Sequence, residues 1–220
     1  MLNNSIYEFL LELRENNNRD WFHANKEKYD KAKKDFEFFI ELVIEQLKTI
    51  DPNISGLQAK DCIYRIYRDT RFSNNKIPYK TNFGAFLSTG GRKSKYAGYF
   101  IQIEPERCFI GGGCYKPDSK TLKAIREEIF HVPTDFKTII DDAEFTKQFS
   151  ELYDDKLKTA PRGYAKDFEY INLLNYKSYV GTKSISDEIA NSDRLSVEIN
   201  QVFKALYPLN QFLNEIIADI

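Results

Sequence analysis

The sequence has few of the residues that build common catalytic and metal centres. Its two histidines, His23 and His131, lie far apart in the chain, so neither a zinc site nor a Ser-His-Asp triad is expected, although a carboxylate metal site stays open. The three cysteines show no CxxC spacing, which indicates small structural residues and favours a reducing, cytoplasmic location. We therefore expect no cofactor and no metal.

Long apolar runs and standard ligand-binding motifs are also missing. No window approaches the roughly 18 apolar residues of a membrane-spanning helix. The N-terminus mixes acids with apolar residues and lacks a basic segment, so no signal peptide and no membrane partner are expected. The glycine motifs of Rossmann and P-loop proteins and the signature of RNA-recognition motifs do not occur.

Positive charge, in contrast, is concentrated in one segment. The chain has 32 Lys and Arg and 33 Asp and Glu, for a net charge of -1. Residues 60–95 nevertheless contain nine cations and two acids, so this segment carries +7 and the rest of the chain -8. A neutral protein with one basic segment favours a local binding site for an anion over general affinity for nucleic acid.

Capping signals and apolar spacing predict helices at both ends of the chain. Ser5 and Glu8 form a capping-box pattern for the first helix, and Asp20 caps a long helix that Asp51 and Pro52 end. After Pro117, helices are expected in five places: from Asp118 or Ser119 to about Phe130, from Pro133, over 143–152, near 167–174, and from Ser192 or Asp193 to Ile217, with a kink or restart at Pro208.

The middle of the chain predicts strands. Segment 63–72 is rich in β-branched and aromatic residues, and strands over 82–89, 96–104 and 107–114 follow it. The turn signals between the later strands favour an antiparallel meander. A further strand is expected near 176–181. With helices before and after the sheet and no linker, the sequence predicts one α+β domain over residues 1–220.

Several motifs together resemble a bacterial and fungal family known as domain of unknown function 2461. They are "NNNRDWFHANKEKYD" (16–30), "RIYRDTRFSNNKIPYKTNFGAF" (65–86), "GYFIQIEP" (98–105), "IGGGCYKPD" (110–118) and "LKTAPRGYAKD" (157–167). The resemblance covers nearly the whole chain and implies a compact α+β domain, with no established activity, cofactor or catalytic residue. Ile77 stands where a small polar residue is expected in the family.

The cations of the expected strand 63–72 are the main site candidates. Arg65 and Arg71 would share one face with Asp69, which could pair with either, while Arg68 would lie among apolar residues and need an anionic partner. Asp69 and Glu104 are the candidate acid–base residues. The full set of expected ligand-binding residues is Arg65, Arg68, Arg71, Lys76, Tyr79, Lys80, Gly112, Arg162, Trp21 and Asn25.

Three of these candidates have a plain structural alternative. The glycines around Gly112 indicate a close approach of a ligand or another backbone, or a helix packed tightly over the sheet. Trp21 and Asn25 lie at the start of the expected long helix, where an anion could bind, but an aromatic there is equally suited to the core.

Three functions remain open from the sequence. The first is a pocket that uses the arginines and lysines to bind a small molecule with a phosphate or carboxylate group, with an enzymatic step possible. The second is a nucleic-acid-binding module that adds Arg92, Lys93 and Lys95 to the same patch. The third is a structural or interaction domain whose arginines pair with core carboxylates. The sequence predicts neither a reaction nor an oligomeric state.

Overall fold

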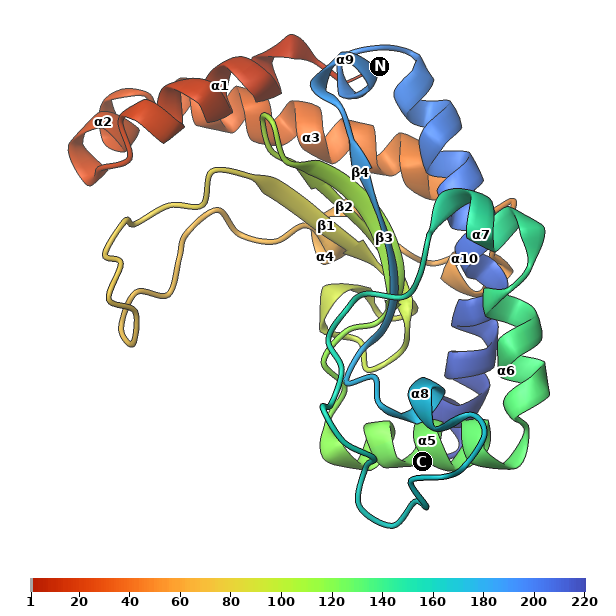
Figure 1. The fold of residues 1–220 in the computed structure, drawn as a ribbon. Helices are drawn as coiled ribbons and strands as arrows, with labels where there is room; N and C mark the ends of the chain where they lie inside the picture. The colour runs from red at the N-terminus through yellow and green to blue at the C-terminus, as the bar shows by residue number, and fades with distance from the viewer. Residues whose placement is uncertain (1) are drawn as a thin grey trace. The chain divides into compact units, whose positions relative to one another are not determined.

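The computed structural model describes residues 2–220 and shows an α+β fold (Figure 1). Four antiparallel strands form one sheet in the order β1-β2-β3-β4, with β1 at Phe83–Leu87, β2 at Gly98–Ile103, β3 at Cys108–Cys114 and β4 at Tyr179–Ile185. The predicted fold class and meander are confirmed. The first strand of the sheet begins at Phe83, however, and not at residue 63.

Helices precede, separate and follow the strands. They are α1 (Asn4–Glu15), α2 (Arg19–Ala24), α3 (Lys26–Leu47), α4 (Ala59–Cys62), α5 (Ser119–His131), α6 (Pro133–Ile140), α7 (Ala143–Gln148), α8 (Ile171–Leu174), α9 (Asp187–Ala190) and α10 (Arg194–Ala218), with short 3-10 turns η1 (Pro52–Ile54) and η2 (Gly91–Lys93). Among the helices of residues 2–220, none has both the length and the apolar character needed to cross a bilayer.

Side-chain caps explain why two helix boundaries in the structure differ from those predicted from the sequence. Asn3, and not Ser5, caps α1, because its side chain accepts a hydrogen bond from the Ser5 amide. The long helix expected from Asp20 is divided at Asn25, whose side-chain amide donates to the carbonyl of Trp21 and so ends α2. Helix α3 starts at the next residue. The sequence predicts no helix at α9, because its four residues are too few to show a periodic apolar pattern.

The chain divides into two compact units, each built from three segments. Unit 1 contains the residues up to Arg92, Phe100–Ile110 and Ser184–Asn200. Unit 2 contains Lys93–Tyr99, Gly111–Lys183 and Gln201–Ile220. That the whole chain behaves as one domain stays a prediction.

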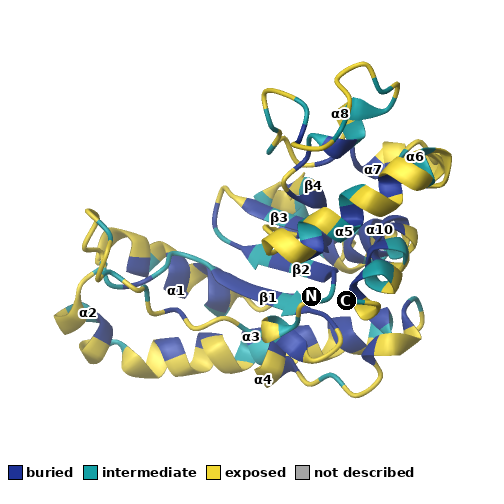
Figure 2. Ribbon diagram, turned by 90° about the horizontal axis from the view of Figure 1, so that it is seen from below, coloured by how far each residue is buried: buried dark blue, intermediate teal, exposed yellow. Residues whose placement is uncertain are grey.

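The core of unit 1 is aromatic. The ring of Phe83, on β1, lies 6.2 Å from Phe9 of α1, and 6.4 and 5.2 Å from Tyr29 and Phe36 of α3. All four rings are buried, and Figure 2 shows α1 and α3 with both buried and exposed positions. Burying each such side chain contributes roughly 1.5–3 kcal/mol, so these contacts hold α1 and α3 on β1.

The core of unit 2 joins α6 and α10 to the sheet. Phe203 of α10 lies 4.7 Å from Tyr99, and Phe136 of α6 lies 5.7 Å from Tyr179 and 5.4 Å from Phe212. Pro208 is inside α10, which continues through it to Ala218, so the helix does not restart there.

Candidate functional site

Residues 63–82 form a projecting arm in place of the expected strand 63–72 (Figure 1). The two sides of the arm pair only at isolated antiparallel bridges, of which Tyr67 with Tyr79 is the outer one and Ile63 with Ala85 the inner one. The amide of Arg68 donates to the carbonyl of Pro78 at 2.9 Å. Because the pairing is interrupted, the expected alternation of two sheet faces along 63–72 does not apply.

The arm is fixed to the N-terminal helices at its outer bridge, through Tyr79. The side-chain amide of Asn17 donates to the Tyr79 carbonyl and accepts from the Tyr79 amide, both at 3.1 Å. The Tyr79 ring stacks on Phe22 of α2 with centroids 4.0 Å apart, and only 4 % of the residue is exposed. Tyr79, expected to bind ligand, is therefore a core residue that anchors the arm.

Three of the five arm cations hold the tip of the arm in shape. Arg71 forms a two-bond ion pair with Asp69, at 3.0 and 2.7 Å. Arg68 donates to the carbonyl of Ile77, and Lys76 donates to that of Thr70, each at 3.0 Å.

Asp69 is consequently a poor candidate for a general base. The hydrogen bonds from Arg71, with the charge of Arg65 as a minor cause, hold the pKa of the Asp69 carboxyl below its usual value. A carboxylate stabilised in this way is a weak proton acceptor.

Arg65 and Lys80 remain, and they lie close together. The ammonium of Lys80 is 5.4 Å from the centre of the Tyr64 ring. Burial, followed by the nearby charge of Arg65, lowers the pKa of Lys80. Within residues 2–220 neither cation forms an ion pair with a carboxylate. Two interacting like charges are unfavourable, and an anionic ligand would relieve this.

The sheet beside these cations has one half-buried face, which we call the open face. On β2, Tyr99, Ile101 and Ile103 are buried, whereas the alternate residues Phe100 and Gln102 are only half-buried. Phe86, Phe100, Gln102, Glu104 and Phe109 make up this face. The Phe100 ring lies 6.3 Å from Tyr64 and 5.3 Å from Phe109, so the aromatic rings continue from the arm across the strands.

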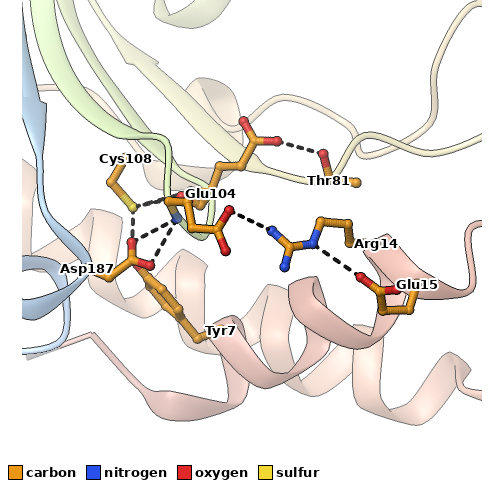
Figure 3. Close-up of polar contacts among 8 residues, drawn as sticks. Tyr7, Arg14, Glu15, Thr81, Glu104, Cys108 and Asp187 are labelled. Carbon is orange, nitrogen blue, oxygen red and sulfur yellow. Dashed lines mark hydrogen bonds and ion pairs between the residues drawn. The ribbon is translucent and has the colours of Figure 1, made fainter.

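Glu104 lies on the open face but is not an arginine partner. Its carboxylate accepts a hydrogen bond from the Thr81 hydroxyl at 2.6 Å (Figure 3). It accepts another from the side-chain amide of Gln102 at 3.0 Å. Among the described residues it forms no ion pair with an arm arginine. Thr81 and Gln102 therefore fix this carboxylate on the open face.

The other expected ligand residues do not join this group. A Cβ at Gly112 would lie 2.4 Å from the Gly98 carbonyl and 2.9 Å from Leu206, so the glycine serves close packing of strand and helix. Trp21 packs on Phe9 at 6.3 Å, and Asn25 ends α2. Arg162 is exposed in the irregular segment of unit 2.

A second polar cluster fixes the turn between β2 and β3. The Tyr7 hydroxyl donates to Asp187 at 3.0 Å and lies 2.9 Å from the sulfur of Cys108 (Figure 3). The same carboxylate accepts from the Glu106 amide, at a residue with a φ of 69°. Asp187 thus stabilises a left-handed backbone that glycine would adopt more readily.

The three thiols should be unreactive in the folded protein. All are buried and unpaired, and burial raises the pKa of Cys62 and of Cys114 to about 12 and also raises that of Cys108. Since thiolate is the reactive form, we expect labelling by a disulfide reagent at pH 8 to be at least about 100-fold slower before unfolding than after it. Rapid labelling of one thiol in the native protein would contradict this.

Of the three cations that the nucleic-acid hypothesis adds to the patch, Arg92 and Lys95 each donate to backbone carbonyls of their own unit. Arg92 donates to the carbonyls of Lys60 and Asp61, both at 3.0 Å, near the end of α4. In unit 2, Lys95 donates to the carbonyl of Ile217 in α10 at 3.1 Å. Lysine and arginine at helix C-termini are favourable for the helix itself. No group of three or more His, Cys, Asp or Glu side chains suited to a metal ion occurs among the described residues.

Sequence reasoning missed the aromatic members of the site. Phe100 and Phe109 follow from the predicted strands 96–104 and 107–114, because alternation on β2 puts Phe100 on the same side as Gln102. Tyr64 was assigned to the expected strand 63–72 but not to the site.

The fold and the candidate site define an α+β protein with an antiparallel sheet whose open face adjoins Arg65 and Lys80, two cations that form no ion pair within the described part of the chain. The chain belongs to the family described as "Conserved hypothetical protein (DUF2461)", whose model matches residues 5–212. This confirms the resemblance seen in the motifs. No curated protein and no solved structure matches the chain significantly.

Proposed function

We propose that this protein binds a small molecule through a phosphate or carboxylate group that Arg65 and Lys80 hold beside the open face of the sheet. The observation that carries the proposal is a pair of interacting cations that form no ion pair with a carboxylate among residues 2–220, next to the exposed Tyr64 ring. A guanidinium and an ammonium bind such oxyanions through charge-assisted hydrogen bonds. The proposal is for binding and assigns no reaction.

A small ligand fits these contacts better than a long nucleic-acid backbone does. A backbone track needs a row of free cations, but Arg92 and Lys95 bind carbonyl groups and Arg71 is paired with Asp69. Glu104 adds a negative charge on the open face, which a polyanion would meet unfavourably. The buried free cysteines support a reducing compartment, and we include a cytoplasmic location in the proposal.

Substitution of the two cations tests the proposal. We would first screen phosphate, sulfate, sugar phosphates and nucleotides by thermal shift, and then measure affinities by titration calorimetry. Lys80→Gln and Arg65→Gln are each expected to weaken binding about 10- to 100-fold, which corresponds to a hydrogen bond to a charged group of about 1.5–3 kcal/mol.

Two variants serve as matched controls. Lys76→Gln removes a lysine from the same arm that contacts only the Thr70 carbonyl, and Arg162→Gln removes an exposed arginine of unit 2. Both should bind as the unaltered protein does, within about twofold after salt screening. Equal losses in the test and control variants would show that binding reflects general charge, and the proposal would fail.

A further inference from the structure

The aromatic rings beside the two cations form a continuous apolar surface. Tyr64, Phe100 and Phe109 follow one another at 6.3 and 5.3 Å. Gly84 of β1 lies under the middle ring: a Cβ there would be 3.3 Å from Phe100, so the missing side chain leaves room for the ring on the sheet. Half-buried aromatic rings on strands are the surfaces on which planar bases stack in proteins that bind nucleotides.

A fixed acceptor lies on the same face, just past the end of β2. Gln102 and Glu104 follow Phe100 at two-residue steps along the strand direction, about 7 Å apart. The Glu104 carboxylate is held by Thr81 and Gln102 and has no cationic partner among the described residues. Each carboxylate oxygen has further acceptor capacity, which suits the amino and imino N–H groups at the edge of a base.

The two cations, the aromatic surface and the Glu104 acceptor together specify one class of ligand. We infer that the molecule bound on the open face is a nucleoside phosphate, with its base on Phe100 and Tyr64, its phosphate at Arg65 and Lys80, and the base edge toward Glu104. The inference rests on the proposed function, because the same cations hold the phosphate. A simple sugar phosphate would leave the aromatic surface unused, and a bare polyphosphate would meet the charge of Glu104 without compensation.

Affinities for a graded set of compounds test the inference. The set is AMP, GMP, CMP and UMP, ribose 5-phosphate, adenosine and a short single-stranded oligonucleotide. At least one nucleotide should bind about tenfold more tightly than ribose 5-phosphate, because only the nucleotide has a base to stack. Phe100→Leu should remove most of this difference and leave ribose 5-phosphate binding unchanged.

Phe72→Leu is the matched control, since Phe72 is 94 % exposed in the arm and is not one of the residues of the open face. It should bind every compound as the unaltered protein does. Melting curves of both variants check that the fold is intact before the affinities are compared.

The possible results separate the inference from the proposed function. Nucleotides that bind no better than ribose 5-phosphate would overturn the inference while the proposed anion site remained. Failure of every phosphate compound to bind would overturn both. An oligonucleotide at least tenfold tighter than any mononucleotide, with binding that falls steeply with salt, would identify single-stranded nucleic acid as the source of the nucleotide. Similar affinities for the oligonucleotide and for the mononucleotides would identify a free nucleotide as the ligand.

Discussion

Gly112→Ala is expected to destabilise the protein by about 3 kcal/mol, the upper part of the usual range for overpacking. The new Cβ would lie 2.4 Å from the carbonyl oxygen of Gly98 and 2.9 Å from Leu206. The Gly98 carbonyl also accepts a hydrogen bond from the buried amide of Asn210, so it cannot move away without weakening that bond. The backbone of β2 at Gly98 and helix α10 at Leu206 would both have to shift.

Urea denaturation of Gly112→Ala and Gly56→Ala measures this effect against a matched control. A Cβ at Gly56 has no atom within 4 Å, so the control should be neutral or slightly more stable through the loss of unfolded-state entropy. If Gly112→Ala unfolded at the same urea midpoint as the unaltered protein, there would be free space beside Gly112 in β3. The ligand-approach interpretation of Gly112 would then return.

Tyr79→Ala is expected to cost about 3–5 kcal/mol, as truncation of a buried aromatic does. The ring stacks on Phe22 at 4.0 Å and lies 5.5 Å from Tyr67, and its removal leaves a cavity between α2 and the arm. The arm would lose its main apolar anchor, although Asn17 would still bind its backbone.

Two further variants separate this packing role from a role in ligand binding. Tyr79→Phe keeps the stacked ring and should unfold at nearly the same denaturant concentration as the unaltered protein. Phe72→Ala removes an exposed ring and should change stability by no more than about 0.5 kcal/mol. If Tyr79→Ala left stability unchanged and removed ligand binding instead, the assignment of Tyr79 to the core would be wrong.

The strands and most helices could be predicted because their signals are local. The turns at Gly90-Gly91 and at 104–107 bound β2, and Asp118 caps α5 with a hydrogen bond to Thr121. The division at Asn25 was harder to predict, since the apolar spacing continues across it. The backbone and side-chain amides of Asn25 both donate to the Trp21 carbonyl where α2 ends.

The arm shows where composition misleads. Residues 63–72 are rich in the residue types that favour strands, yet a strand also needs an unbroken partner. The opposite side of the arm contains Pro78, which has no amide hydrogen to donate to a ladder. Only isolated bridges form, and the expected faces of the strand are lost with the ladder.

The positive charge of the candidate site could be predicted from the sequence, but the residues that form the site could not. The sequence shows five cations in 65–80, and only tertiary contacts reveal that Arg71 pairs with Asp69 while Lys80 lies over Tyr64. Residue type does not distinguish the arginines: the backbone carbonyl of Ile77 binds Arg68, whereas Arg65 forms no ion pair among the described residues.

The pKa of the Lys80 ammonium, measured by NMR with and without sulfate, tests the central claim most directly. Sulfate keeps its charge over the range of the titration, and Lys80→Gln assigns the signal. In the free protein the pKa should lie below 10.5, because burial and then Arg65 disfavour the charged form. A bound anion favours that form, so sulfate should raise the pKa, and affinity should fall as the pH rises through the free-protein value. An identical titration curve with and without sulfate would contradict an anion site at Arg65 and Lys80.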